Sequence, residues 1–219
     1  ERNLILDKNE LHDNIAIIDV GAENTDVGVF EGSTYVYTNS IPVGGENITN
    51  DIALVLNIEK EEADKLKRQY GLALKSFIDN DNDIILNTCK DNNKNKIIKS
   101  SELIEIIEAR IEDMFLIINK DLNNQGIKSR INNVILTGQG IVNISKSDVA
   151  GKINLNIPVK ISTGRLIGTT RPAYRTAYAL VRYIASRPFT KTVSSSIDTK
   201  SSENIFKNIL ERIKEFFYS

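Results

Sequence analysis

The sequence is poor in the residues on which thiol and disulfide chemistry depend. Its 219 residues include one cysteine, Cys89, and one histidine, His12. A single cysteine cannot form an intramolecular disulfide, and a thiol with no histidine near it is not expected to be catalytic. His12 stands in a polar segment with no motif around it. These scarcities exclude a disulfide-stapled fold and give no sign of thiol catalysis.

Excess charge and long apolar runs are missing as well. The formal net charge is −1, so no overall field attracts nucleic acid, which is not expected as a partner. No apolar run approaches the roughly 18 residues of a membrane-spanning helix. The contents of hydrophobic residues, 41%, and charged residues, 26%, are ordinary for a globular domain. The length suits one large domain or two small ones.

The most informative stretch is Ile15–Phe30. Its apolar run Ile15–Ile18 predicts a strand buried on both faces, and the strand ends in Asp19-Val20-Gly21. A carboxylate at the tip of a buried strand can face a magnesium ion or its water shell, so Asp19 is a candidate metal ligand. Gly21 allows backbone amides to approach a phosphate. The alternative is an ordinary β-hairpin with a polar turn.

The remaining patterns predict alternating strands and helices. We expect strands at 14–20, 26–31, 34–41, 83–88, 96–99, 131–137 and 157–162, and helices at 46–57, 59–70, 101–122 and 172–185. Gly44-Gly45 opens the first helix, where either a phosphate approaches exposed amides or the chain makes a plain tight turn. Ile48, Ile52, Val55 and Leu56 should form its buried side. In helix 101–122, the stripe Leu103, Ile107, Ile111, Met114, Ile118 and Leu122 is expected to be core.

Four stretches resemble known motifs, in the right order. Asp19-x-Gly-x-x-x-Thr-Asp26 resembles the second phosphate loop of the actin-like ATPase superfamily, Val134–Gly140 its adenosine loop, and Arg171–Leu180 its last helix. Ile41–Ala53 is similar to a segment of the bacterial cell-division protein family FtsA. The resemblance implies an α/β fold: an actin-like (ribonuclease H-like) second domain with a mixed sheet flanked by helices.

The resemblance also implies a division of the chain. Residues 1–58 and 131–186 would form the nucleotide-facing core, and 59–130 an inserted peripheral subdomain. The superfamily carries a first phosphate loop before the stretch described above, but only 14 residues precede Ile15. We therefore expect this chain to be the second half of a longer protein, or a truncated one.

For the cofactors ATP and Mg²⁺, the resemblance implies two sets of contacts. The phosphates and the metal would meet Asp19, Gly21, Asn24, Thr25 and Asp26, with Gly44 and Gly45 near by. The nucleoside would meet Asp64, Lys67, Arg68, Gly138, Gln139 and Gly140.

The sequence departs from the family pattern at two of these positions. The family usually has glutamate where Asp64 stands and often glycine where Gln139 stands. Glu23 brings a negative charge near the terminal phosphate, so we expect weaker ATP binding than in members with glycine there.

A partner site is implied on the long helix. The segment Ile107–Asp113 resembles the helix by which FtsA proteins hold the C-terminal peptide of FtsZ. Arg110 would face a carboxylate of that peptide, and Asp113 stands where the family tends to have glutamate. Structural ion pairing explains these two residues equally well.

The end of the chain predicts a flexible linker followed by an amphipathic helix. Residues 190–202, within a linker of 187–202, contain eight Ser or Thr among thirteen. In helix 203–219, one arc of about 140° holds every large apolar residue and no charge: Ile205, Phe206, Ile209, Leu210, Ile213, Phe216 and Phe217. FtsA proteins end in such a membrane-targeting helix. The alternative is docking on its own domain or on a sister copy.

These features together favour one function and leave two alternatives. The first is an actin-like cell-division scaffold that binds ATP, polymerises and tethers FtsZ filaments to the cytoplasmic face of the membrane at the division site. ATP turnover would be slow or incidental. The second is an actin-like enzyme of the sugar-kinase or chaperone type, and the third a pilus-assembly protein of the PilM type. A tail helix has no use in a soluble kinase, which favours the scaffold.

Overall fold

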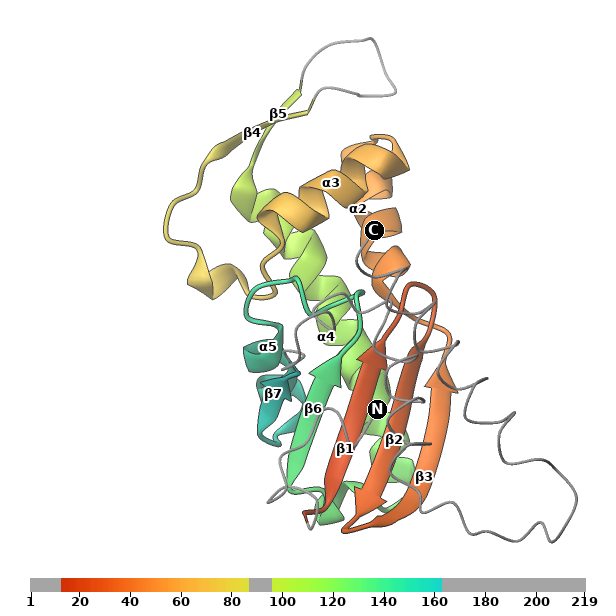
Figure 1. Cartoon of the computed structure of the whole chain (residues 1–219). Coiled ribbons are helices and arrows are strands. Elements are labelled where there is room, and N and C mark those ends of the chain that lie inside the picture. The colour runs from red at the N-terminus through yellow and green to blue at the C-terminus, as the bar shows by residue number, and fades with distance from the viewer. Residues whose placement is uncertain (1–12, 87–95, 163–219) are drawn as a thin grey trace, which may run out of the picture. The chain divides into compact units, whose positions relative to one another are not determined.

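The computed structural model describes residues 13–86 and 96–162, which belong to one compact unit. The central element of this unit is a five-stranded sheet in the order β3-β2-β1-β6-β7 (Figure 1). Its strands are β1 (Ile15–Val20), β2 (Thr25–Glu31), β3 (Thr34–Ile41), β6 (Asn133–Thr137) and β7 (Val159–Ile161). β1 to β3 form an antiparallel meander, whereas β6 pairs with β1 and β7 in parallel. The predicted mixed sheet is confirmed.

The centre of the sheet is apolar because β1 is buried on both faces. Ala16, Ile18 and Val20 belong to the main core, while Ile15 and Ile17 join Ile135 in a second cluster on the opposite face. The parallel register places Asp19 opposite Thr137. The carboxyl ends of the neighbouring parallel strands β1 and β6 therefore lie side by side at one end of the sheet. In α/β sheets, ligands bind at the carboxyl ends of the strands.

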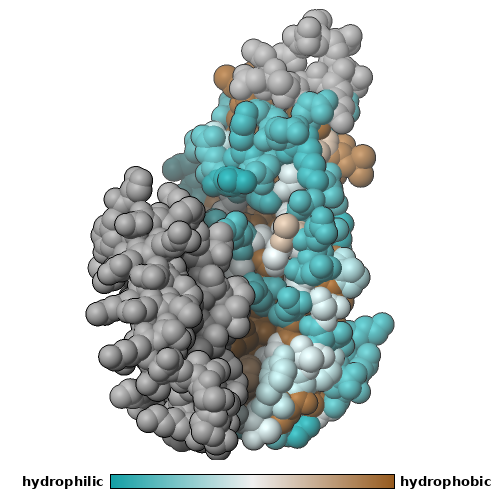
Figure 2. All heavy atoms as spheres, turned by 45° about the vertical axis from the view of Figure 1, so that its right-hand side comes forward, coloured by the Kyte–Doolittle hydropathy of each residue, from teal (hydrophilic) through white to brown (hydrophobic). Residues whose placement is uncertain are grey.

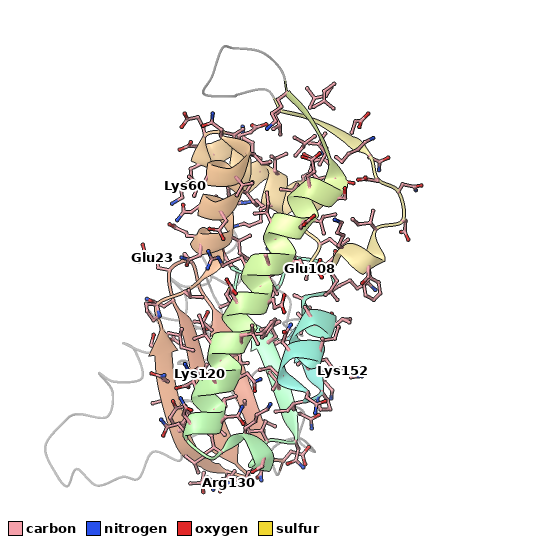
Figure 3. All side chains as sticks on the ribbon, turned by 180° about the vertical axis from the view of Figure 1, so that it is seen from behind. Glu23, Lys60, Glu108, Lys120, Arg130 and Lys152 are labelled. Atoms are coloured by element: carbon pink, nitrogen blue, oxygen red, sulfur yellow. The ribbon has the colours of Figure 1, made fainter. Side chains whose placement is uncertain are left out.

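One face of the sheet is covered by α4 (Ser100–Asn124) and α5 (Ser147–Leu155), as both Figure 1 and the reverse view in Figure 3 show. All six residues of the predicted α4 stripe are buried, from Leu103 to Leu122, and they join the same core cluster as the sheet. α5 packs closely on α4 because Gly151 has no Cβ; one built there would stand 2.9 Å from the Phe115 ring.

Two further helices, α2 (Gly45–Leu56) and α3 (Lys60–Tyr70), lie beyond the end of the sheet at which β1 and β6 finish (Figure 1). Ile48, Ile52 and Leu56 of α2 are buried as predicted, but Val55 is 61% exposed. The prediction for Val55 was wrong because the core meets only a narrow face of α2, and Val55 lies outside it. In Figure 2, hydrophilic side chains cover most of the described surface in view, and hydrophobic ones form small separate groups.

The small antiparallel pair β4 (Asp83–Leu86) and β5 (Lys96–Lys99) precedes α4. The start of α4 is capped by Asp81, a residue from outside the helix. Its carboxylate accepts hydrogen bonds from the backbone N–H of Ser101 and from the hydroxyls of Ser100 and Ser101. The division into a core and an inserted subdomain stays a prediction. The linker, the tail helix, helix 172–185, His12 and Cys89 lie outside the described residues.

Candidate functional site

Three loops meet at the carboxyl end of β1. They are the β1–β2 turn, the start of α2, and the segment after β6. Gly45 donates its N–H to the carbonyl of Gly21 (2.9 Å), and Glu46 donates to that of Ala22 (2.8 Å). Gly140 donates to the carbonyl of Val20 (2.9 Å). These backbone hydrogen bonds join the three predicted motif segments into one junction.

The glycines of the motifs make this junction possible. A Cβ on Gly45 would stand 2.5 Å from the Cα of Gly140, and one on Gly140 would overlap the carbonyl oxygen of Gly21. Gly138 has φ +95°, which is accessible to glycine at little cost. The sequence interpretation assigned these glycines to ligand approach. In the structure, they also allow one loop to pack directly on another.

The junction closes one end of a cavity of about 620 Å³, within the usual range of small-molecule sites. The cavity lies between the end of the sheet and helices α2 and α3. Nine of the predicted nucleotide residues line it: Asp19, Gly21, Gly45, Asp64, Lys67, Arg68, Gly138, Gln139 and Gly140. The structure thus brings together residues from four separate segments of the chain.

Four predicted residues do not line the cavity: Asn24, Thr25, Asp26 and Gly44. Thr25 is fully buried and its hydroxyl donates to the carbonyl of Val43 (2.7 Å), so it fastens β2 to the segment before α2. Asp26 is exposed in β2, and the carbonyl of Asn24 accepts the N–H of Gly21. Gly44 packs against Ala22.

The first amides of α2 are not presented to a ligand. Those of Gly45 and Glu46 bond to the carbonyls of the β1–β2 turn, that of Asn47 bonds to the carbonyl of Gly44 (3.1 Å), and that of Gly44 bonds to the Asn47 side chain (2.8 Å). Of the two interpretations of Gly44-Gly45, the tight turn matches this geometry better than the open phosphate site.

Lys67 occupies the side of the cavity formed by α3. Its ammonium group donates to the carbonyl of Gly45 (2.9 Å) and to the hydroxyl of Thr49 (2.6 Å), and lies 3.3 Å from the Asp64 carboxylate. Only 13% of the side chain is exposed. Burial lowers the pKa of Lys67, and the hydrogen bond and charge of Asp64 oppose that shift.

Asp64 is held by two cations of its own helix. Arg68, one turn further along α3, binds the second carboxylate oxygen at 2.6 Å. Burial raises the pKa of Asp64, but the hydrogen bonds and charges of Arg68 and Lys67 outweigh it and keep the pKa below its ordinary value. Asp64 is therefore an anion whose oxygens accept from protein donors. The i, i+3 proximity of Asp64 and Lys67 follows the helix geometry expected from the sequence.

The cavity wall also carries three charged residues that were not among the predicted nucleotide contacts: Glu46, Lys60 and Glu61. Lys60 forms an ion pair with Glu46 (2.8 Å), which links α3 to α2, and Glu61 also lines the cavity. Glu23, in the β1–β2 turn, lies below Lys60 on the same side of the molecule in Figure 3, and its charge acts on Lys60.

Asp19 lines the cavity at the end of β1 and is partly buried. Among the described residues, no group of three or more His, Cys, Asp or Glu side chains could enclose a metal ion. Mg²⁺ is commonly bound by one or two carboxylates together with phosphate oxygens and water. A single aspartate at the end of β1 fits that mode and does not fit a metal held by protein alone.

Thr49 was missed by the sequence analysis, as were Thr137 and Asn143, which also line the cavity. Thr49 stands four residues after Gly45, so it lies on the same face of α2. That spacing is the signal that could have identified it. A threonine inside a helix usually bonds back to its own helix, and nothing in the sequence indicates that it also meets a lysine of another helix.

The two predicted partner residues lie on α4, away from the cavity lining. Arg110 donates two hydrogen bonds to Asp51 of α2, one of them at 3.0 Å from Nη2 to Oδ1. Asp113 is more exposed and lies 3.7 Å from Arg110. The ion pair expected as the alternative is therefore present, and it joins α2 to α4. Among the described residues, no helix is both long and apolar enough to cross a membrane.

Comparison with solved structures identifies the fold. The structure of MreB5 of Spiroplasma citri bound to ADP superposes with a TM-score of 0.64, at 19% sequence identity, over 83% of this chain and 58% of that one. Its form bound to AMPPNP gives a TM-score of 0.61 at 18% identity, over 82% and 57%. The chain therefore has an actin-like fold.

Comparison of sequences identifies the family. The model of the family "Cell division protein FtsA" matches residues 16–179. Cell division protein FtsA of Bacillus subtilis strain 168 is 32% identical over 178 residues, covering 81% of this chain and 40% of the relative. The chain belongs to the FtsA family of cell-division proteins. It spans about half the length of the curated relatives that it matches.

Proposed function

We propose that this chain forms one wall of an ATP-binding cleft in an actin-like cell-division scaffold. The observation that carries the proposal is the cavity at the carboxyl ends of β1 and β6, which gathers the phosphate-loop, adenosine-loop and α3 residues. Its volume of about 620 Å³ suits a nucleotide. MreB5, which shares the fold, was crystallised with ADP and with AMPPNP.

Each end of the cavity would bind a different part of the nucleotide. The base and ribose would lie between α3 and the Gly138–Gly140 segment, where Asp64 and Gln139 offer polar contacts. The phosphates would point toward Asp19 and Gly21. Bound Mg²⁺ would neutralise phosphate charge, and Asp19 would hold it directly or through water. Because Glu46 and Glu61 also line the cavity, binding should depend strongly on the metal.

A titration of a fluorescent ATP analogue, displaced by ATP, tests this proposal with the 219-residue chain and with the full-length gene product. The curated relatives are about twice as long as the part of them that this chain matches, and a longer product could supply an opposite wall and would then bind more tightly. Asp64→Asn should weaken binding several-fold. Asp79→Asn makes the same charge change in an exposed loop and should not alter binding. Equal affinities for the wild type and Asp64→Asn would place the nucleotide elsewhere.

The FtsZ C-terminal peptide is the proposed partner of α4. Asp51 accepts hydrogen bonds from two of the five N–H donors of Arg110, and its negative charge would compete with a peptide carboxylate for the guanidinium. Asp51→Asn leaves the shape unchanged and weakens that competition. It should tighten peptide binding several-fold in a fluorescence-anisotropy titration, and Arg110→Ala should abolish binding. A peptide that binds Arg110→Ala as well as wild type would exclude this site.

Attachment to the cytoplasmic face of the membrane at the division site is proposed for the tail. Phe206→Glu or Ile209→Glu should abolish co-sedimentation with lipid vesicles, because insertion would be driven by the apolar arc. Asn208→Glu adds the same charge outside that arc on the predicted helix and should retain binding. Self-association into filaments would follow from the actin-like fold, and sedimentation with and without ATP tests it.

An enzyme of the sugar-kinase or chaperone type stays the alternative. The family match favours the scaffold over both this alternative and a protein of the PilM type. Phosphoryl transfer from ATP to a small substrate by the full-length gene product would overturn that preference. Slow hydrolysis of ATP alone would be consistent with the scaffold.

A further inference from the structure

The hydroxyl of Thr49 is the least expected member of the cavity wall. Thr49 lies in the second turn of α2 and is 2% exposed. Its Oγ1 donates to the carbonyl of Gly45 (3.4 Å) and accepts a hydrogen bond of 2.6 Å from the ammonium group of Lys67. One hydroxyl thus joins a backbone carbonyl of the three-loop junction to a buried cation of α3.

The ammonium group of Lys67 is surrounded by protein acceptors. An ammonium group has three N–H donors, and Lys67 meets three acceptors: the Gly45 carbonyl, the Thr49 hydroxyl and the Asp64 carboxylate. These contacts direct the ammonium group toward the protein. Lys67 therefore acts on the cavity as a fixed positive charge that holds Asp64 and Gly45 in place.

We propose that Thr49 is a positioning residue for the nucleotide site: its hydroxyl keeps the Lys67 cation fixed between α2 and α3. This inference rests on the proposed nucleotide function. Without the hydroxyl, the buried ammonium group loses one of two uncharged acceptors and has to turn toward Asp64 or lose its proton. Either change releases the link between α3 and the junction, and with it the position of Asp64.

The charge of Lys67 depends on groups from several elements. Asp64 and Arg68 face it from α3, Glu46 acts on it from α2, and Asp19 lines the same cavity from the end of β1. Burial already lowers the pKa of Lys67, and the Thr49 hydroxyl offsets part of the lost hydration. Removing the hydroxyl should lower that pKa further, so that the cation is lost at a lower pH.

Two variants separate the hydroxyl from the shape of the side chain. Thr49→Val keeps the shape and removes the oxygen, whereas Thr49→Ser keeps the oxygen. Thr49→Val should weaken ATP binding about tenfold, the size expected for a hydrogen bond to a charged group, and Thr49→Ser should stay within about twofold of wild type. The loss of ATP affinity at alkaline pH should begin at a lower pH in Thr49→Val.

An NMR titration of the Lys67 side chain, assigned with Lys67→Met, gives a readout that needs no nucleotide. The Lys67 pKa should be lower in Thr49→Val than in wild type and unchanged in Thr49→Ser. Equal Lys67 pKa values in all three proteins would overturn the inference even where ATP binds. Failure of the full-length wild type to bind ATP, with the pKa shift present, would instead overturn the proposed nucleotide function and leave only the contact by which Thr49 fixes Lys67.

Discussion

The ammonium group of Lys67 donates a 2.9 Å hydrogen bond to the carbonyl of Gly45, 22 positions earlier in the chain. Gly45 in turn donates its N–H to Gly21, so α3, α2 and the β1–β2 turn are connected through one glycine. This relationship explains why the cavity has defined walls although its residues come from segments far apart in the sequence. It also makes the site sensitive to small changes at the junction.

Replacing Gly140 with alanine should destabilise the fold and impair nucleotide binding together. The added Cβ would overlap the Gly21 carbonyl and stand 2.9 Å from the Gly45 nitrogen, and both are backbone atoms that cannot move independently. Overpacking of this kind costs about 1–3 kcal/mol. Urea unfolding of the 219-residue chain would measure it.

Gly126→Ala is the matched control. Gly126 has φ +64° and nothing lies within 4 Å of its Cβ position, so only the backbone conformation opposes the change, at about 1 kcal/mol. A smaller loss than for Gly140→Ala, without any effect on ATP affinity, is expected. If the two variants lost stability equally and bound ATP with the same affinity, close packing of the loops would not be the reason why position 140 requires glycine.

Tyr37 should ionise well above the ordinary tyrosine pKa of about 10. Burial and the hydrogen bond to Asp121 (2.8 Å) raise the pKa of Tyr37 to about 12. The folded state therefore holds the Tyr37 proton more tightly than the unfolded state does. The associated stability is complete below about pH 10 and is lost as the pH rises toward about 12. Subtracting the absorbance titration of Tyr37→Phe from that of wild type gives the titration of Tyr37 alone. A midpoint near the ordinary tyrosine pKa of about 10 would contradict this prediction.

Asp81 should contribute to stability only while it is ionised. The backbone hydrogen bond from Ser101 holds the pKa of Asp81 below its ordinary value, and the Ser100 and Ser101 hydroxyls add to it. The stabilisation is therefore complete above the unfolded-state pKa of about 4 and disappears as the pH falls through the folded-state pKa. Thermal melts of wild type and Asp81→Ala should differ at pH 7 and converge in acid. A difference that stayed constant down to pH 2 would show that the carboxylate charge is unimportant.

The ion pair between Arg110 and Asp51 should be measurable in a double-mutant cycle. Each side chain is less than 30% exposed and the contact uses two hydrogen bonds, so the coupling should be about 1–2 kcal/mol, more than for a typical surface pair. Unfolding of the Asp51→Ala, Arg110→Ala and double variants gives the coupling. A value near zero would mean that Arg110 is available to a partner at no cost.

The elements of the fold were predictable because their patterns are strong. The continuous apolar run of β1 can be buried only as a strand at the centre of the sheet, and the stripe of α4 only by a helix packed on the core. Both elements lie where the sequence indicated. Val55 was misassigned because its spacing from Ile48 and Ile52 suits a broad buried face, and the width of that face depends on the neighbouring helices.

For the candidate site, the sequence predicted which residues line the cavity better than it predicted the contacts that those residues make. The motifs identified Asp64, Lys67 and Gly138, which do line one cavity. They also suggested Thr25, whose hydroxyl instead stabilises a loop, because a motif specifies a residue type and not its hydrogen-bond partner. Thr49 gave no signal, since its role arises only where two helices meet.

The most direct test of the account is photolabelling of the full-length gene product with 8-azido-ATP in the presence of Mg²⁺, followed by peptide mapping. The central claim is that the adenine lies between α3 and the segment after β6. It predicts label within residues 60–70 or 137–144, reduced by excess ATP. Label that ATP does not reduce, or that avoids both segments, would contradict it.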